Sequence, residues 1–287
     1  MEYRFSDKIA SLKPSAIREV LKATSVPGMI PFAAGNPAPD AFPVAEVQEI
    51  ATDILKNCPI DALQYGVTEG YPELISLIKD RMKSKYGIGR DFDSIIITSG
   101  AQQVMDLSTK VLCNEGDVVI CEIPPFIGSL NCFRSYNAKL VGVPVDADGM
   151  NIDALEKALD ENPNAKMIYT IPNFQNPAGV TMSLEKRRKL YELAKAHNVM
   201  ILEDNPYGDL RVAGEDVPNI KSFDEDGIVI YSGSFSKILA PGIRIGFTVA
   251  PAPVVAKMTV GKQAGGVCSH DPADADDSRR VDEEIRC

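Results

Sequence analysis

The chain has 287 residues, of which 45% are hydrophobic, and its net charge is −10. This length allows one large domain or two ordinary ones, and the acidic charge argues against nucleic acid or an anionic membrane as the main partner. No apolar run is long enough to span a bilayer, and no signal peptide precedes the polar start. We therefore expect a cytoplasmic protein without membrane contact.

Cysteine and histidine usage argues against a disulfide or metal framework. The six cysteines are scattered without any Cys-x-x-Cys spacing, which indicates reduced thiols. The chain has only two histidines, His197 and His270, so we expect neither a histidine metal site nor a histidine-based catalytic triad.

Residues 1–50 are predicted to form an N-terminal arm and a loop. Residues 14–21 read as a short helix with one apolar face, which could pack against the chain's own core or against a second subunit. Gly35 lies in a stretch so rich in glycine and proline that it must be irregular.

Two further helices are predicted at 44–56 and 72–85. Pro72 suits the first turn of the second helix. The turn between them contains Tyr65, and a tyrosine in such a place more often packs than binds a ligand.

From residue 94 to 249, apolar β-type segments alternate with amphipathic helical segments. The strands are expected at 95–98, 118–121, 139–143, 167–171, 200–203, 229–231 and 245–249. The helices between them are expected at 102–113, 127–134, 152–159 and 184–197. This alternation predicts an α/β fold with a mostly parallel seven-stranded sheet and helices on both faces, in a large domain at 51–258.

The last strand is predicted to run antiparallel to the others. Only about ten residues separate Tyr231 from Ile245, whereas a parallel crossover needs about a dozen or more.

Unusual residues follow the ends of two of these strands, which is where open α/β sheets bind ligands. Gly100, Ala101 and Gln102 open a helix whose N–H groups could hold an anion, although an ordinary strand-to-helix turn would look the same. Asp204 ends a buried strand, where a carboxylate is costly unless it is paired with a cation. It could instead cap the turn that follows.

A lysine follows the strand that ends near Tyr231. Burial lowers the pKa of a lysine amine, so Lys237 is a candidate Schiff-base nucleophile, although a lone lysine after a strand is usually a solvated charge. The hydroxyls of Ser234 and Ser236 could donate to phosphate oxygens, and Arg244 adds a fixed charge for the same anion. Ser-x-x-Lys also occurs in serine β-lactamases, but their Ser-Asp-Asn and Lys-Thr-Gly partners are absent from this chain.

Four motifs in the same order resemble those of fold-type-I, class I/II aminotransferases that use pyridoxal phosphate (PLP). They are Tyr-Gly-x-Thr-x-Gly-Tyr-Pro, Pro-Asn-Phe-Gln-Asn-Pro-x-Gly, Glu-Asp-Asn-Pro-Tyr-Gly-Asp and the lysine motif Ser-Gly-Ser-Phe-Ser-Lys, which ends at Lys237. The branch they most resemble contains the α-aminoadipate, kynurenine and aromatic aminotransferases. The resemblance implies a homodimer that moves an amino group between an α-amino acid and a 2-oxo acid, with 2-oxoglutarate as the expected acceptor.

The resemblance also implies a role for each candidate residue. Lys237 would hold PLP and move the substrate proton, and Asp204 would keep the pyridine nitrogen protonated. Contacts to the PLP phosphate are implied for Gly100, Ala101, Gln102, Arg244 and, from the neighbouring subunit, Tyr65. Phe126 is implied to stack on the ring face of PLP, where relatives usually have tyrosine. Asn176 and Tyr207 are implied to contact the 3′-oxygen of PLP. The substrate carboxylate is implied to meet Gly35 and Asn176. Cis peptide bonds are expected at Ile123–Pro124 and Asn176–Pro177.

Two other functions remain open at this point. One is a PLP-binding module without catalysis, such as the sensor half of a transcription regulator, which would carry an N-terminal helix-turn-helix. The other is a PLP-dependent lyase or decarboxylase.

The resemblance ends at about Gln263, and residues 259–287 form a divergent acidic tail in place of the family's C-terminal small domain. From Asp271 onward the tail has seven acidic and three basic residues and almost no apolar ones, so we expect it to be disordered. The change suggests a truncation or a reading-frame shift, or a genuine short variant. Without the family's carboxylate-binding arginine, we expect weak transamination.

Overall fold

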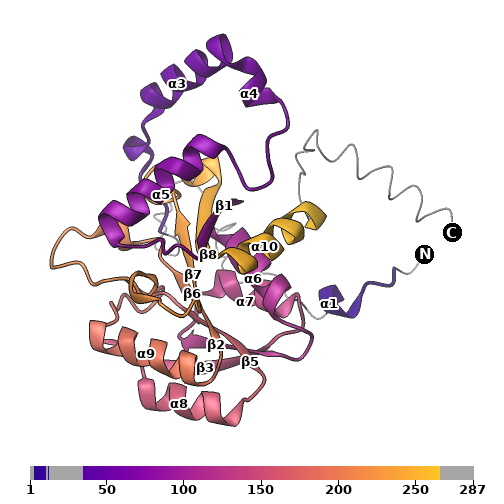
Figure 1. The fold of residues 1–287 in the computed structure, drawn as a ribbon, viewed down its shortest axis with the longest axis vertical. Coiled ribbons are helices and arrows are strands. Elements are labelled where there is room, and N and C mark those ends of the chain that lie inside the picture. The colour runs from indigo at the N-terminus through magenta and orange to yellow at the C-terminus, as the bar shows by residue number, and fades with distance from the viewer. Residues whose placement is uncertain (1–2, 11, 13–34, 266–287) are drawn as a thin grey trace, which may run out of the picture.

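The computed structural model describes residues 3–10, 12 and 35–265 (Figure 1). The strands are β1 Asp93–Ser99, β2 Val118–Ile123, β3 Lys139–Asp146, β4 Gly149–Met150, β5 Ala165–Thr170, β6 Met200–Asp204, β7 Val229–Ser234 and β8 Ile245–Pro251. The helices are α1 Asp7–Ala10, α3 Val44–Asn57, α4 Pro59–Leu63, α5 Pro72–Tyr86, α6 Ala101–Leu112, α7 Ile127–Arg134, α8 Ile152–Glu161, α9 Leu184–Ala196 and α10 Ala252–Gly265. The helix predicted at 14–21 and the tail beyond residue 265 lie outside the described residues.

The strands form one sheet in the order β1-β8-β7-β6-β5-β2-β3-β4. Strand β8 runs antiparallel to both β1 and β7, and the pairs β2–β3, β2–β5, β5–β6 and β6–β7 are parallel. The prediction of a mostly parallel sheet with an antiparallel β8 is therefore confirmed. The sheet has one strand more than predicted, because β4 pairs antiparallel with β3 at the edge. With only two residues, β4 is too short to leave a hydrophobic pattern in the sequence.

Helices cover both faces of the sheet, so alternate strand residues are buried on opposite sides. On one face, strand residues such as Ile120 pack with apolar side chains of α8 and α9, and α5 covers the neighbouring part of the same face. On the other face, residues such as Val119 pack with α6, α7 and α10. The predicted three-layer α/β arrangement is visible in Figure 1.

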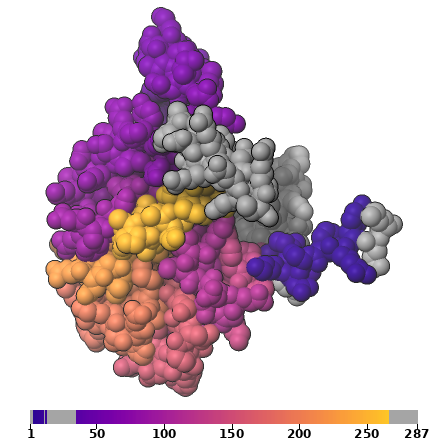
Figure 2. All heavy atoms as spheres, turned by 45° about the vertical axis from the view of Figure 1, so that its right-hand side comes forward, coloured from indigo at the N-terminus to yellow at the C-terminus, as the bar shows by residue number. Residues whose placement is uncertain are grey.

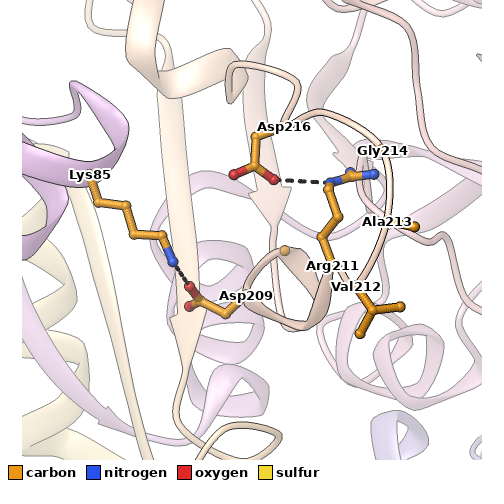
Figure 3. Close-up of a pocket in the computed structure, with 8 residues that line it drawn as sticks. Lys85, Asp209, Arg211, Val212, Ala213, Gly214 and Asp216 are labelled. Atoms are coloured by element: carbon orange, nitrogen blue, oxygen red, sulfur yellow. Dashed lines mark hydrogen bonds and ion pairs between the residues drawn. The ribbon is translucent and has the colours of Figure 1, made fainter.

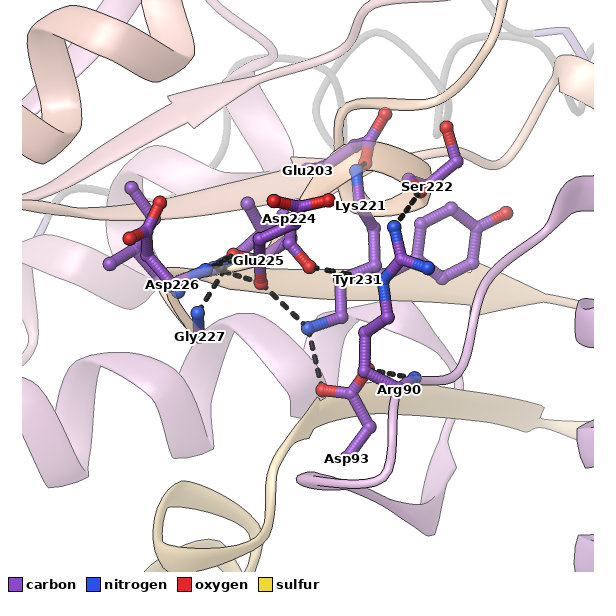
Figure 4. Close-up of polar contacts among 12 residues, drawn as sticks. Arg90, Asp93, Glu203, Lys221, Ser222, Asp224, Glu225, Asp226, Gly227 and Tyr231 are labelled. Atoms are coloured by element: carbon purple, nitrogen blue, oxygen red, sulfur yellow. Dashed lines mark hydrogen bonds and ion pairs between the residues drawn. The ribbon is translucent and has the colours of Figure 1, made fainter.

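A buried ion network holds together the amino ends of β1 and β7 (Figure 4). Lys221 Nζ lies 2.6 Å from Asp93 Oδ1 and 2.9 Å from Asp224 Oδ2, and the Lys221 side chain is 0% exposed. The Asp224 carboxylate also accepts the backbone N–H groups of Gly227 and Val229. Removal of one partner would leave a buried charge unpaired, so breaking this network should destabilise the end of the sheet opposite the predicted ligand edge.

The two ends of the described chain differ in how they pack. Helices α3 and α4 contain no buried residue and project from the body of the molecule (Figures 1 and 2). Helix α10 instead continues past residue 258, and Thr259 and Gly261 are buried. Residues 259–265, which were expected to begin the acidic tail, therefore extend a helix that covers the sheet.

The four described cysteines are free thiols, as predicted. None of the helices within the described ranges combines the length and apolar character needed to cross a membrane.

Candidate functional site

Most of the predicted site residues gather at one edge of the sheet, where β1, β5, β6 and β7 end and β8 begins. Asp204 at the end of β6 pairs with Ser232 of β7, and Ser234 at the end of β7 pairs with Gly246 of β8. This register brings residues that are far apart in the chain to the carboxyl edge, as expected for a ligand site in an open α/β sheet.

Lys237 lies in the loop directly after β7 and is partly buried. Its Nζ donates a hydrogen bond to the backbone carbonyl of Gly35, at 3.0 Å. Between the strand and the lysine, the backbone N–H of Ser236 donates to Ser234 Oγ at 3.1 Å. The structure thus brings the predicted nucleophile and the predicted substrate loop into direct contact.

Asp204 is 2% exposed and has one free acceptor atom. Its Oδ2 accepts a hydrogen bond from Tyr169 Oη at 3.0 Å, whereas its Oδ1, also buried, has no hydrogen-bond partner among the described residues. Burial raises the pKa of this carboxyl to about 6, and the hydroxyls of Tyr169 and Ser232 oppose that rise. A buried carboxylate oxygen without a partner is costly, so it fits a cationic group such as the protonated nitrogen of PLP.

Asn176 and Tyr207 come from two different loops and meet at the same place. Asn176 Nδ2 donates to Tyr207 Oη at 3.0 Å. Asn176 follows β5 and precedes a cis bond to Pro177, and the cis bond between Ile123 and Pro124 is likewise present. Both predicted cis bonds are therefore confirmed. The two side chains, which the resemblance assigns to one oxygen atom of PLP, are close enough to share it.

Gly100 and Arg244 form a cradle at the start of α6. Gly100 has a φ of +71°, and a Cβ at this position would collide with the guanidinium of Arg244. Arg244 Nη2 donates to the carbonyl of Ser99 at 3.0 Å. The first N–H groups of α6, at Ala101 and Gln102, have no acceptor within the helix because of its geometry. Free N–H groups beside a guanidinium make a suitable site for a phosphate.

The remaining two candidates differ in their surroundings. Phe126 immediately precedes α7 and packs partly buried against the core that α6 and α7 cover. Tyr65 lies apart: it is 66% exposed, and no hydrogen bond joins it to another predicted site residue in the described part of the chain.

Two residues to which the resemblance assigned no role support the site. Glu122, at the end of β2, is 3% exposed and accepts hydrogen bonds from Thr170 Oγ1 at 2.6 Å and from the Ile171 N–H at 3.1 Å. Burial raises the pKa of Glu122 to about 7. Gln175 Nε2 donates to the carbonyl of Pro124 at 2.8 Å, which joins the loops that follow β2 and β5. The signal that identified Asp204, a carboxylate ending an apolar strand, would also have identified Glu122.

A separate polar pocket of about 250 Å³ opens beside Asp209 (Figure 3). Its cationic side chains are already paired, Lys85 with Asp209 and Arg211 with Asp216. None of the predicted cofactor residues lines this pocket.

Comparisons with known proteins agree with this geometry. The profile of the family "Aminotransferase class I and II" matches residues 27–275. The aromatic-amino-acid aminotransferase 1 of Thermococcus litoralis is 43% identical over 94% of this chain and 66% of its own length. The chain spans 64–66% of the length of the first curated relatives that it matches.

Two solved structures are also similar. The kynurenine aminotransferase of Pyrococcus horikoshii has a TM-score of 0.87 and 39% identity, covering 92% of this chain and 66% of that one. The α-aminoadipate aminotransferase of Thermus thermophilus, complexed with N-(5′-phosphopyridoxyl)-L-leucine, has a TM-score of 0.83 and 33% identity, with 92% and 66% coverage.

Proposed function

The chain belongs to the aminotransferase class I and II family, and we propose that it binds PLP and moves the amino group of an α-amino acid to a 2-oxo acid such as 2-oxoglutarate. The observation that carries this proposal is the buried, unpartnered Oδ1 of Asp204, at the edge of the sheet where Lys237 also lies. A cationic pyridine nitrogen is the chemistry that would satisfy this oxygen.

Residues at the edge of the sheet hold PLP by its different parts. Asp204 would pair with the pyridine nitrogen, and Phe126 would cover one face of the ring. Asn176 and Tyr207 would donate to the 3′-oxygen. The phosphate would be held by the N–H groups of Gly100, Ala101 and Gln102, the hydroxyls of Ser234 and Ser236, and the guanidinium of Arg244.

Lys237 has the catalytic role. Bound PLP supplies an electron sink for the carbanion at the substrate α-carbon. The Nζ of Lys237 would hold PLP covalently, and the amine, once freed, would take the proton from the substrate α-carbon and later return one. The hydrogen bond to Gly35 orients Nζ in the free chain, and the backbone of Gly35, with Asn176, faces the substrate carboxylate.

A second copy of the chain is the proposed partner. One face of α3 is apolar and exposed, and it consists of Val44, Val47, Ile50, Ile54 and Leu55. The resemblance assigns the exposed Tyr65 to the phosphate cradle of that second copy.

An absorbance titration tests the proposed reaction. The relatives are named for aromatic amino acids, kynurenine and aminoadipate, so these amino acids are the first to add to the PLP-loaded chain. We expect the yellow band to bleach and then to return when 2-oxoglutarate is added. Lys237→Ala is the control and should show no covalently held PLP.

The same titration separates the alternatives. A non-catalytic PLP module would show no net product after both additions. A lyase or decarboxylase would form its product without any need for the 2-oxo acid. If none of these amino acids bleaches the band, transamination of this substrate class is contradicted.

A further inference from the structure

Arg187, in the first turns of α9, is a buried cation without an ion pair. It is 0% exposed, and no carboxylate lies within ion-pair distance of it among the described residues. All five of its hydrogen bonds go to neutral oxygens. Burial lowers the pKa of its guanidinium to about 10, although the charge of Glu203 opposes this. A cation buried in this way is costly, so its hydrogen bonds must organise something that an apolar side chain would not.

The acceptors of Arg187 come from the loops on either side of the site. Nη2 donates to the carbonyl of Pro172 at 3.0 Å and to Asn173 Oδ1 at 2.7 Å, in the loop that leads to Asn176. Nη1 donates to the carbonyls of Val217 and Pro218, at 3.2 and 3.1 Å, in the loop that begins near Tyr207. One planar group thus joins the two loops.

The guanidinium also sets the direction of a chain of amide hydrogen bonds. Because it can only donate, Asn173 must turn its Oδ1 toward Arg187. Asn173 Nδ2 then donates to Asn205 Oδ1 at 2.9 Å, and Asn205 Nδ2 donates to Tyr231 Oη at 2.9 Å. Asn205 Oδ1 also accepts the N–H of Gly208 at 3.1 Å. The chain of amides ends in the turn that follows Asp204.

We propose that Arg187 is a positioning residue for the ligand edge of the sheet. It touches neither substrate nor cofactor, but it holds the two loops so that Asn176 and Tyr207 stay at hydrogen-bond distance. The nature of the ligand rests on the proposed function, whereas the ordering of the loops does not. Packing alone cannot account for the arrangement, since a methionine would fill the same space without any of the five hydrogen bonds.

Three variants test this role. Arg187→Lys keeps the charge but loses the planar fork, and Arg187→Met keeps only the volume. Asn173→Asp keeps an acceptor for Arg187 but removes the donor to Asn205, and it remains informative if the Arg187 variants do not fold. Tyr191→Phe is the matched control on the same helix, because its hydroxyl contacts Asp226 and not the site loops.

The first readout is hydrogen exchange of the chain without cofactor, and the second is the dissociation constant of PLP. In Arg187→Lys and Asn173→Asp we expect exchange in 173–178 and 205–208 to be at least about tenfold faster, and PLP binding to be weakened by about tenfold or more. Tyr191→Phe should leave the loop exchange rates and the PLP affinity unchanged, even if it lowers thermal stability as much as the Arg187 variants do.

The outcomes separate this inference from the proposed function. Lower thermal stability in Arg187→Lys with unchanged loop exchange and unchanged PLP affinity would mean a purely structural arginine, and would overturn the inference. If the parent chain does not bind PLP, the proposed function fails, while the exchange measurement still decides whether Arg187 orders the loops.

Discussion

Glu122 and Asp204 are both buried carboxyl groups at strand ends, yet their hydrogen bonding separates their roles. Both oxygens of Glu122 accept hydrogen bonds from the chain, from Thr170 and Ile171. Asp204 is held through one oxygen and keeps the other free. Since a satisfied buried group supports structure and an unsatisfied one invites a ligand, we expect Asp204 to face the cofactor and Glu122 to hold the strands.

Asp204→Asn should weaken PLP binding by about tenfold or more, because the amide keeps the shape but not the charge that stabilises a protonated nitrogen. Glu122→Gln is the matched control, with the same chemical change at a neighbouring strand end. Fluorescence titration with PLP measures both variants. Equal losses of affinity in the two would contradict the distinction between these carboxyl groups.

Glu122 should also make stability depend on pH. Burial raises the pKa of its folded-state carboxyl from 4.5 to about 7, so between these values the folded chain keeps a proton that the unfolded chain has released. The contribution of Glu122 to the free energy of unfolding therefore falls as pH rises through this window, by on the order of 3 kcal/mol at most.

Glu122→Gln removes this effect. We expect the unfolding free energy of the variant, minus that of the parent, to become more positive from pH 5 to pH 8. Urea unfolding at the two pH values measures it, and a difference that does not change with pH would show that Glu122 does not titrate in this window.

The contact between β8 and the start of α6 shapes the phosphate cradle. A Cβ at Gly246 would lie 2.6 Å from the carbonyl carbon of Gly100, which is backbone and cannot move aside as a side chain could. The absence of a side chain on β8 is therefore what allows the helix to begin against the strand.

Gly246→Ala should cost about 1–3 kcal/mol of stability, since the added methyl forces the strand and helix apart. It should also weaken binding of PLP more than binding of pyridoxal, which lacks the phosphate. Gly242→Ala is the control, because an added Cβ there meets nothing within 4 Å. An unchanged ratio of the two affinities in Gly246→Ala would argue against a phosphate in the cradle.

At the scale of the whole molecule, the apolar face of α3 is exposed in the described part of the chain, whereas helices α5 to α10 contribute buried residues to the layers that cover the sheet. Ile50 is 58% exposed near the middle of this face, and no residue of α3 is buried. A face of this kind usually marks a protein–protein interface. Its burial in a second copy would explain why the helix is amphipathic although it contacts little of its own chain.

Ile50→Lys should therefore shift the chain from dimer to monomer without changing its circular dichroism spectrum, because a charge is costly in an apolar interface. Glu49→Lys places the same lysine on the opposite side of α3 and should leave the dimer intact. Sedimentation velocity over a range of concentrations measures both. A parent chain that is monomeric at every concentration would rule out the proposed partner.

The sequence by itself determined the alternation of strands and helices, the antiparallel direction of β8 and the residues at the ligand edge. Hydrophobic periodicity is local, and the direction of β8 depends only on the length of one connection. Asp204 and Lys237 could be located for the same reason, since each stands next to a recognisable strand.

Only the tertiary structure decided the order of the strands, the presence of β4, the full extent of α10 and the partners of the buried polar groups. Glu122 meets Thr170, which is 48 residues away in the chain, and Arg187 meets Val217, which is 30 residues away. A buried polar group is defined by the donors and acceptors that folding brings to it. Those partners depend on which strands lie side by side, and no local pattern of residues encodes that.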